Sequence, residues 1–130
     1  MKKVLFIILV FNSLTILAQR TYWKKEFGNG TLYMAVIKSS SEFGPHIRTY
    51  FSNRKHKALL YRYKKFYNPN IYRLKKRNGW SGKAYFKYDG SKLIYIKFGK
   101  RHVLTRISRS ETPRHVREKV YFREAFIGNQ

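Results

Sequence analysis

The stretch from Lys83 to Ile107 decides the fold, and it reads KAYFKYDGSKLIYIKFGKRHVLTRI. Asp89 and Gly90 supply the positive backbone dihedral angle that a tight β-hairpin requires. A second turn follows at Gly99. Residues 83–88, 92–98 and 103–107 alternate in the way expected of strands. The stretch therefore predicts three consecutive antiparallel strands.

The middle strand of this unit is apolar on both sides. Leu93 and Tyr95 share one face, whereas Ile94, Ile96 and Phe98 share the other. A strand that is half exposed has only one apolar face, whereas a strand buried on both faces reads as a nearly continuous apolar run. We therefore expect 92–98 to be a central strand.

Turn signals divide the rest of the chain at similar intervals. They are Gly28-Asn29-Gly30, Gly44-Pro45, Asn68-Pro69-Asn70 and Asn78-Gly79. Short strands separated by such turns are typical of all-β domains. The fold class predicted is mainly β, with an antiparallel meander that forms a small barrel or a sandwich-like sheet.

Two segments fit more than one secondary structure. Residues 57–67 alternate as a strand but also place apolar residues along one side of a helix, and we expect a strand. Residues 113–127 follow Thr112 and precede Gly128, as if Thr112 were the N-cap, Pro113 the first helical residue and Gly128 the C-terminal cap of a helix. The same residues also alternate as a strand. For 113–127 both interpretations remain open.

The first 18 residues resemble a bacterial export signal. Met1-Lys2-Lys3 is positively charged, residues 4–11 are apolar, and Ala18 is a small residue before Gln19. We expect residues 1–18 to be a signal peptide cleaved between Ala18 and Gln19, and residues 19–130 to be a single basic β-rich domain. An uncleaved N-terminal anchor is the alternative. Secretion or a periplasmic location follows from this prediction, with no transmembrane segment in the mature chain.

The charge of the chain is extreme for its size. Its 130 residues carry 29 Lys and Arg against 6 Asp and Glu, a net charge of +23. Loss of Lys2 and Lys3 with the signal peptide leaves +21, whereas a small domain typically carries a magnitude of about 2–8. This excess predicts an anionic partner: nucleic acid, lipopolysaccharide or anionic lipid, or an acidic glycan. The absence of cysteine excludes disulfides and thiolate zinc sites.

The positive charge is densest between Glu42 and Asp89, where thirteen Lys or Arg occur without an acidic residue. If the turn at Pro69 pairs Phe66 with Arg73, one face of the hairpin lines up cations, with Lys64 opposite Lys75 and Arg62 opposite Arg77. The other face then carries Tyr61, Tyr63, Tyr67, Tyr72 and Leu74. Phosphates or carboxylates bridging such a face would relieve its repulsion. The predicted anion-binding residues are Arg62, Lys64, Lys65, Arg73, Lys75, Lys76 and Arg77, with aromatic contacts from Tyr61, Tyr63, Tyr72 and Trp80.

Signals for catalysis are weak. The histidines are His46, His56, His102 and His115, and no spacing links them to a carboxylate or to one another as metal ligands. We expect no catalytic site, no metal site and no cofactor. The predicted function is that of an exported, non-enzymatic protein that binds an anionic partner through a basic–aromatic face. An exported nuclease-type toxin and an envelope structural or protein-binding role are the alternatives, and the oligomeric state stays open.

Overall fold

The computed structural model describes residues 20–40, 42–53, 58–67, 70–89, 91–118 and 122–127, and the statements below concern these residues. The predicted signal peptide and its cleavage position between Ala18 and Gln19 lie outside them. No helix in the described ranges has the length and hydropathy needed to cross a membrane. The elements are β1 (Arg20–Phe27), β2 (Gly30–Ile37), β3 (His46–Phe51), β4 (Ala58–Tyr67), β5 (Ile71–Lys76), β6 (Gly79–Asp89), β7 (Lys92–Lys97), β8 (Lys100–Ile107), the 3-10 turn η1 (Arg109–Glu111), α2 (Arg114–Arg117) and β9 (Phe122–Glu124).

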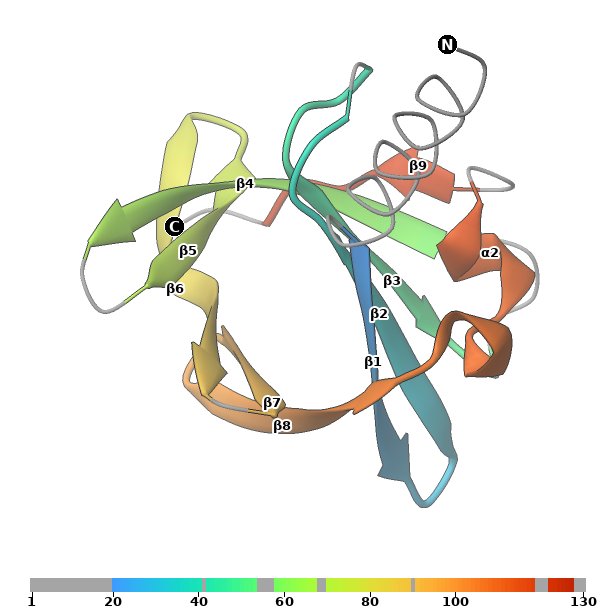
Figure 1. Cartoon of the computed structure of the whole chain (residues 1–130). Helices are drawn as coiled ribbons and strands as arrows, with labels where there is room; N and C mark the ends of the chain where they lie inside the picture. Colours follow the sequence, from blue (N-terminus) through green and yellow to red (C-terminus); the bar gives the residue numbers. More distant parts are fainter. Residues whose placement is uncertain are drawn as a thin grey trace, which may run out of the picture.

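The strands form a closed barrel. Each strand from β1 to β7 pairs antiparallel with the next along the chain, and β8 returns to pair with β1 (Figure 1). This is an up-and-down barrel of eight strands, so the predicted β class and the barrel alternative are confirmed. Residues 58–67, for which a helix was also considered, form strand β4. The three-strand unit around 92–98 is β6, β7 and β8.

Side chains that point inward fill most of the barrel. An eight-stranded barrel encloses a space that side chains can just fill, and aromatic rings supply much of the volume here. Tyr72 stacks on Phe86 with ring centroids 5.0 Å apart and planes 8° apart. The interior cluster consists of Trp23, Met34, Val36, Ile47, Tyr61, Tyr63, Leu74, Ala84, Phe86, Leu93, Tyr95, Leu104 and Ile127. Burial of each large apolar side chain contributes about 1.5–3 kcal/mol, so this interior dominates stability.

A short C-terminal segment covers part of the barrel's outer wall. Val116 of α2 packs with Tyr22, Ala35, Ile37 and Ile107, which form a second, smaller buried cluster. The helix considered for 113–127 is confined to Arg114–Arg117 and is capped by Pro113, not Thr112. It ends there because Glu118 is already extended, and residues 122–124 form β9.

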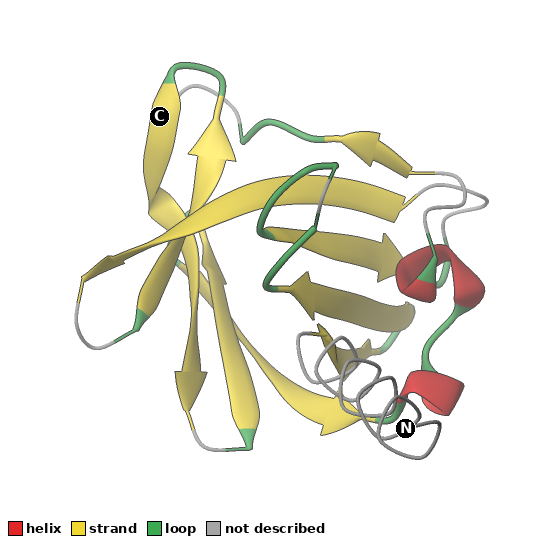
Figure 2. Cartoon of the chain, turned by 45° about the horizontal axis from the view of Figure 1, so that its top comes forward, coloured by secondary structure: helices red, strands yellow, loops and turns green. Residues whose placement is uncertain are grey.

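Strand β9 runs parallel to β4 and completes the wall beside it (Figure 2). Leu59 and Leu60 pair with both β3 and β9, so β9 lies on the edge of β4 opposite β3. The same edge pairs with β5 farther along, from Tyr63 to Tyr67. A bridge between Lys76 and Ile127 continues this arrangement. The last described residues therefore extend the wall where β5 ends.

Candidate anion-binding surface

Three cations and two aromatic rings gather on the outer face of β4, β5 and β6. Lys64 pairs directly opposite Arg73, and both point outward because their neighbours Tyr63 and Leu74 are buried in the barrel. We call Lys64, Phe66, Arg73, Lys75 and Trp80 the cation–aromatic cluster. Strand pairing thus brings together residues that are up to 16 positions apart in the chain.

The cations of the cluster lie over the rings. The Lys64 ammonium is 4.6 Å from the Phe66 ring centroid and 4.8 Å from that of Trp80. The Arg73 guanidinium carbon is 4.7 Å from the Phe66 centroid, and the Lys75 ammonium is 5.8 Å from that of Trp80. The two ring centroids are 6.3 Å apart. Because the face of an aromatic ring is negative, each such contact stabilises a cation by about 0.5–1 kcal/mol at an exposed site.

Irregularities in the strands place the two rings. The pairing of β4 with β5 shifts between Lys65 and Tyr67, at Phe66. The pairing of β5 with β6 also shifts, between Arg73 and Lys75, so that Lys75 lies opposite Trp80. The Ser81 hydroxyl oxygen accepts hydrogen bonds from the backbone N–H groups of Lys83 at 3.1 Å and Ala84 at 2.7 Å. These bonds stabilise the irregular stretch of β6 that follows Trp80.

The structure separates the predicted anion-binding residues into two groups. Lys64, Arg73 and Lys75 come together in the cluster. The other four make none of the ring contacts described above. Arg62 forms an ion pair with Glu124, with Nε 3.2 Å from Oε1. Lys65 lies opposite Tyr72, Lys76 lies opposite Gly79, and Arg77 is exposed in the turn that follows β5. The expected register was wrong by two residues, since Lys64 faces Arg73 and not Lys75. The bulge near Phe66 accounts for one residue of this difference, and the other is already present beside the turn, where Tyr67 lies opposite Ile71 and not Tyr72.

The predicted aromatic contacts divide in the same way. Trp80 belongs to the cluster, whereas Tyr61, Tyr63 and Tyr72 point into the barrel, as the alternation of the hairpin indicated. Burial, followed by the charges of Tyr88 and Tyr72, raises the pKa of Tyr63. Its hydroxyl donates to the Ile37 carbonyl at 3.1 Å. Phe66 takes the place of these tyrosines on the outer face, and it was not among the predicted contacts.

Carboxylates are engaged elsewhere on the described surface. Lys24 pairs with Glu26, Arg114 with Glu118, and Arg62 with Glu124. Glu111 accepts hydrogen bonds from the side chain and backbone of Ser108, which lower its pKa. Glu118 has its pKa lowered by the hydrogen bond from Arg114.

The histidines of the described chain serve the fold. His46 is buried, with Nδ1 2.9 Å from the Gly44 carbonyl oxygen and Nε2 accepting from Arg48 Nε at 3.2 Å. Arg48 also donates to the Val116 and Arg117 carbonyls at 3.3 and 3.2 Å, so it caps the C-terminal end of α2. Burial, then the charge of Arg20, lowers the pKa of Arg48. His115 packs its ring on Tyr50, and His56 lies outside the described residues.

Metal ligands do not gather in the described ranges, where no three His, Cys, Asp or Glu side chains are placed to hold an ion. The comparisons with known proteins give no further identification. The chain matches no family model, no curated protein and no solved structure.

Proposed function

We propose that this protein binds an anionic polymer through the cation–aromatic cluster. The observation that supports the proposal is the placement of Lys64, Arg73 and Lys75 on adjacent strands around two aromatic rings. Adjacent strands lie about 4.7–4.9 Å apart, so several charges of one flexible polyanion can be bound at once. An anion between Lys64 and Arg73 also relieves the repulsion of like charges placed directly opposite each other.

The rings contribute in two ways. They hold the cations in place before the ligand arrives, which reduces the side-chain entropy lost on binding. The parts of Phe66 and Trp80 that remain accessible can stack on planar groups, and base stacking on an aromatic side chain contributes about 1–3 kcal/mol for each base. A single-stranded nucleic acid presents both phosphates and free bases. It is therefore the polyanion that suits the cluster best.

A pair of matched variants tests the proposal. The triple variant K64Q/R73Q/K75Q removes the cations of the cluster, and the control K92Q/K100Q/R101Q removes the same charge from exposed positions of β7 and β8. Binding of a fluorescent oligothymidylate should weaken far more in the first variant than in the control, as measured by anisotropy at low salt. Equal losses would mean that the charge acts diffusely over the whole surface, and the cluster would have no special role.

The location we propose for this activity is outside the cytoplasm. The support is the basic and apolar character of residues 1–18, followed by the small residue Ala18. Protein recovered from its native host should begin at Gln19 when its intact mass is measured. Recovery of only the full-length chain would contradict export by cleavage.

A further inference from the structure

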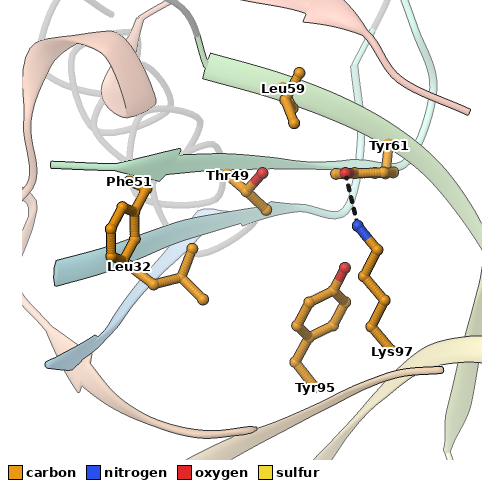
Figure 3. A pocket seen from close by; sticks show the side chains of 7 residues that line it. All are labelled: Leu32, Thr49, Phe51, Leu59, Tyr61, Tyr95 and Lys97. Atoms are coloured by element: carbon orange, nitrogen blue, oxygen red, sulfur yellow. Dashed lines mark hydrogen bonds between the residues drawn. The ribbon is translucent and has the colours of Figure 1, made fainter. Parts of the chain in front are cut away.

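One end of the barrel interior is not filled. A cavity of about 200 Å³, partly open to solvent, lies at the end of the barrel where β3 and β7 finish. Leu32, Phe51 and Leu59 supply apolar walls, and Thr49, Tyr61, Tyr95 and Lys97 supply polar groups (Figure 3). These side chains come from β2, β3, β4 and β7, so rigid strands hold the cavity. It is separate from the cation–aromatic cluster, which lies on the outer face.

The polar side of the cavity carries a positive charge. Lys97 reaches across the barrel from β7, and its ammonium donates to the Tyr61 hydroxyl at 3.5 Å (Figure 3). The same ammonium lies 5.5 Å from the Tyr61 ring centroid and 5.9 Å from that of Phe98. None of the described residues that line the cavity is acidic. Lys97 is half-buried, and because partial loss of water around a charge is unfavourable unless the charge is paired, this position favours an anionic group beside it.

A second lysine, Lys25 of β1, contacts His102, which packs on the cavity residue Tyr95. His102 stacks on Tyr95 with ring centroids 6.2 Å apart, and its Nδ1 is 3.5 Å from the Lys25 ammonium. Burial, then the charges of Lys25 and Lys100, lowers the pKa of His102. A neutral imidazole can accept a hydrogen bond from Lys25 at this distance. The positive potential at this end of the barrel therefore comes from more than one strand.

Two exposed aromatic rings lie at this end of the barrel. Phe98 is 51% exposed and Phe27 is 37% exposed, which is unusual for such large hydrophobic side chains. Phe98 also has a φ of 51°, a left-handed conformation that a bulky residue rarely adopts. Its backbone N–H donates to the Lys83 carbonyl at 3.1 Å, which helps to hold it there. Exposed rings beside a cavity that holds a half-buried cation suit the entry of an amphipathic molecule.

We propose that the barrel cavity binds a small amphipathic carboxylate, with the carboxylate at Lys97 and Tyr61 and the apolar body between Leu32, Phe51 and Leu59. Size sets the class of ligand, since a cavity of about 150 Å³ accommodates a benzene ring. The cavity of about 200 Å³ therefore suits one ring with a short acidic substituent and excludes a polymer. This ligand site is independent of the proposed polyanion surface.

Calorimetric titration with phenylacetate tests this site, with phenylacetamide as its uncharged counterpart. The purified protein should bind one phenylacetate per chain and bind the amide more weakly. The K97M variant should weaken phenylacetate binding by about tenfold to a hundredfold, as expected for loss of one charge-assisted hydrogen bond. It should leave amide binding unchanged, and K97R should retain most of the affinity for the acid.

Two controls make the outcome decisive. Lys92 lies on the same strand but is exposed, so K92M should bind phenylacetate as the unchanged protein does. The variant K64Q/R73Q/K75Q should also retain phenylacetate binding, which separates this site from the polyanion surface. Equal affinity for acid and amide, equal losses in K97M and K92M, or no saturable phenylacetate binding by protein shown to be folded by circular dichroism would overturn the proposal.

Discussion

Replacing Lys64, Arg73 and Lys75 together by glutamine should flatten the salt dependence of oligonucleotide binding by a calculable amount. These three cations lie on adjacent strands of one face, so each can contact a separate phosphate of a single strand. Each contact with single-stranded nucleic acid contributes about 0.7 to the slope of log affinity against log salt, so three contacts contribute about 2. With this slope, a fourfold rise in salt from about 50 to about 200 mM lowers the affinity by a factor of about 16.

The assay is a set of anisotropy titrations with oligothymidylate at four or five salt concentrations. The unchanged protein should lose about 16-fold more affinity than the triple variant over that range. The two binding curves should therefore converge as salt rises. If the slope of the triple variant matched that of the unchanged protein, the three cations would not contact phosphates and the reasoning would be refuted.

The same variant tests the electrostatic balance within the cluster. Like charges directly opposite each other cost about 0.2–1 kcal/mol, whereas the four cation–ring contacts contribute about 0.5–1 kcal/mol each. The ring contacts outweigh the repulsion. The triple variant should therefore have a free energy of unfolding in urea that is lower by about 1–4 kcal/mol. A more stable variant would show that repulsion dominates.

Other substitutions have separable effects. Trp80→Leu should weaken oligothymidylate binding by at least about 1 kcal/mol but leave binding of a sulfated glycan nearly unchanged, and equal losses for both ligands would exclude stacking. Arg48→Met should lower the free energy of unfolding by about 2–3 kcal/mol, since three hydrogen bonds from a buried guanidinium are lost; an unchanged urea midpoint would contradict its role as the cap of α2. Because the folded-state pKa of His102 is lowered, the unfolded chain binds its proton first, and stability should fall as pH drops below the ordinary value of about 6.5. His102→Gln should reduce the loss of melting temperature between pH 7.5 and 5.5, and an identical pH profile would argue against this titration.

Strand pattern and turn residues were sufficient to predict the class of fold. Asp89-Gly90 and the inward row of Leu93 and Tyr95 predicted β6 and β7 and their pairing. Closure into a barrel was only one of two alternatives, because it depends on β1 pairing with β8, which are distant in the chain. No local pattern reveals such a pairing.

The candidate sites were less accessible from sequence. Alternation identified Lys64 and Arg73 as outward residues of one face, but the pairing beside the turn and the bulge at Phe66 each displaced the register by one residue. The bulge lies at Phe66, whose ring packs among the cations. A bulge is set by tertiary packing, so spacing alone did not predict it. Lys97 carried a readable signal, since it follows Leu93 and Tyr95 in the inward row of β7. A charged residue in such a row indicates a polar interior site.

The short pairing between β1 and β8 affects the order in which the strands of the barrel join during folding and separate during local unfolding. It spans only three residue pairs, from Tyr22 with Ile107 to Lys24 with Thr105, whereas β1 and β2 share eight. Joining these strands closes a loop of about 80 residues, which costs more chain entropy than any hairpin of the meander. The seam should therefore form last during folding and separate first in the native state. Amide protons along this seam should exchange with solvent sooner than those between β1 and β2.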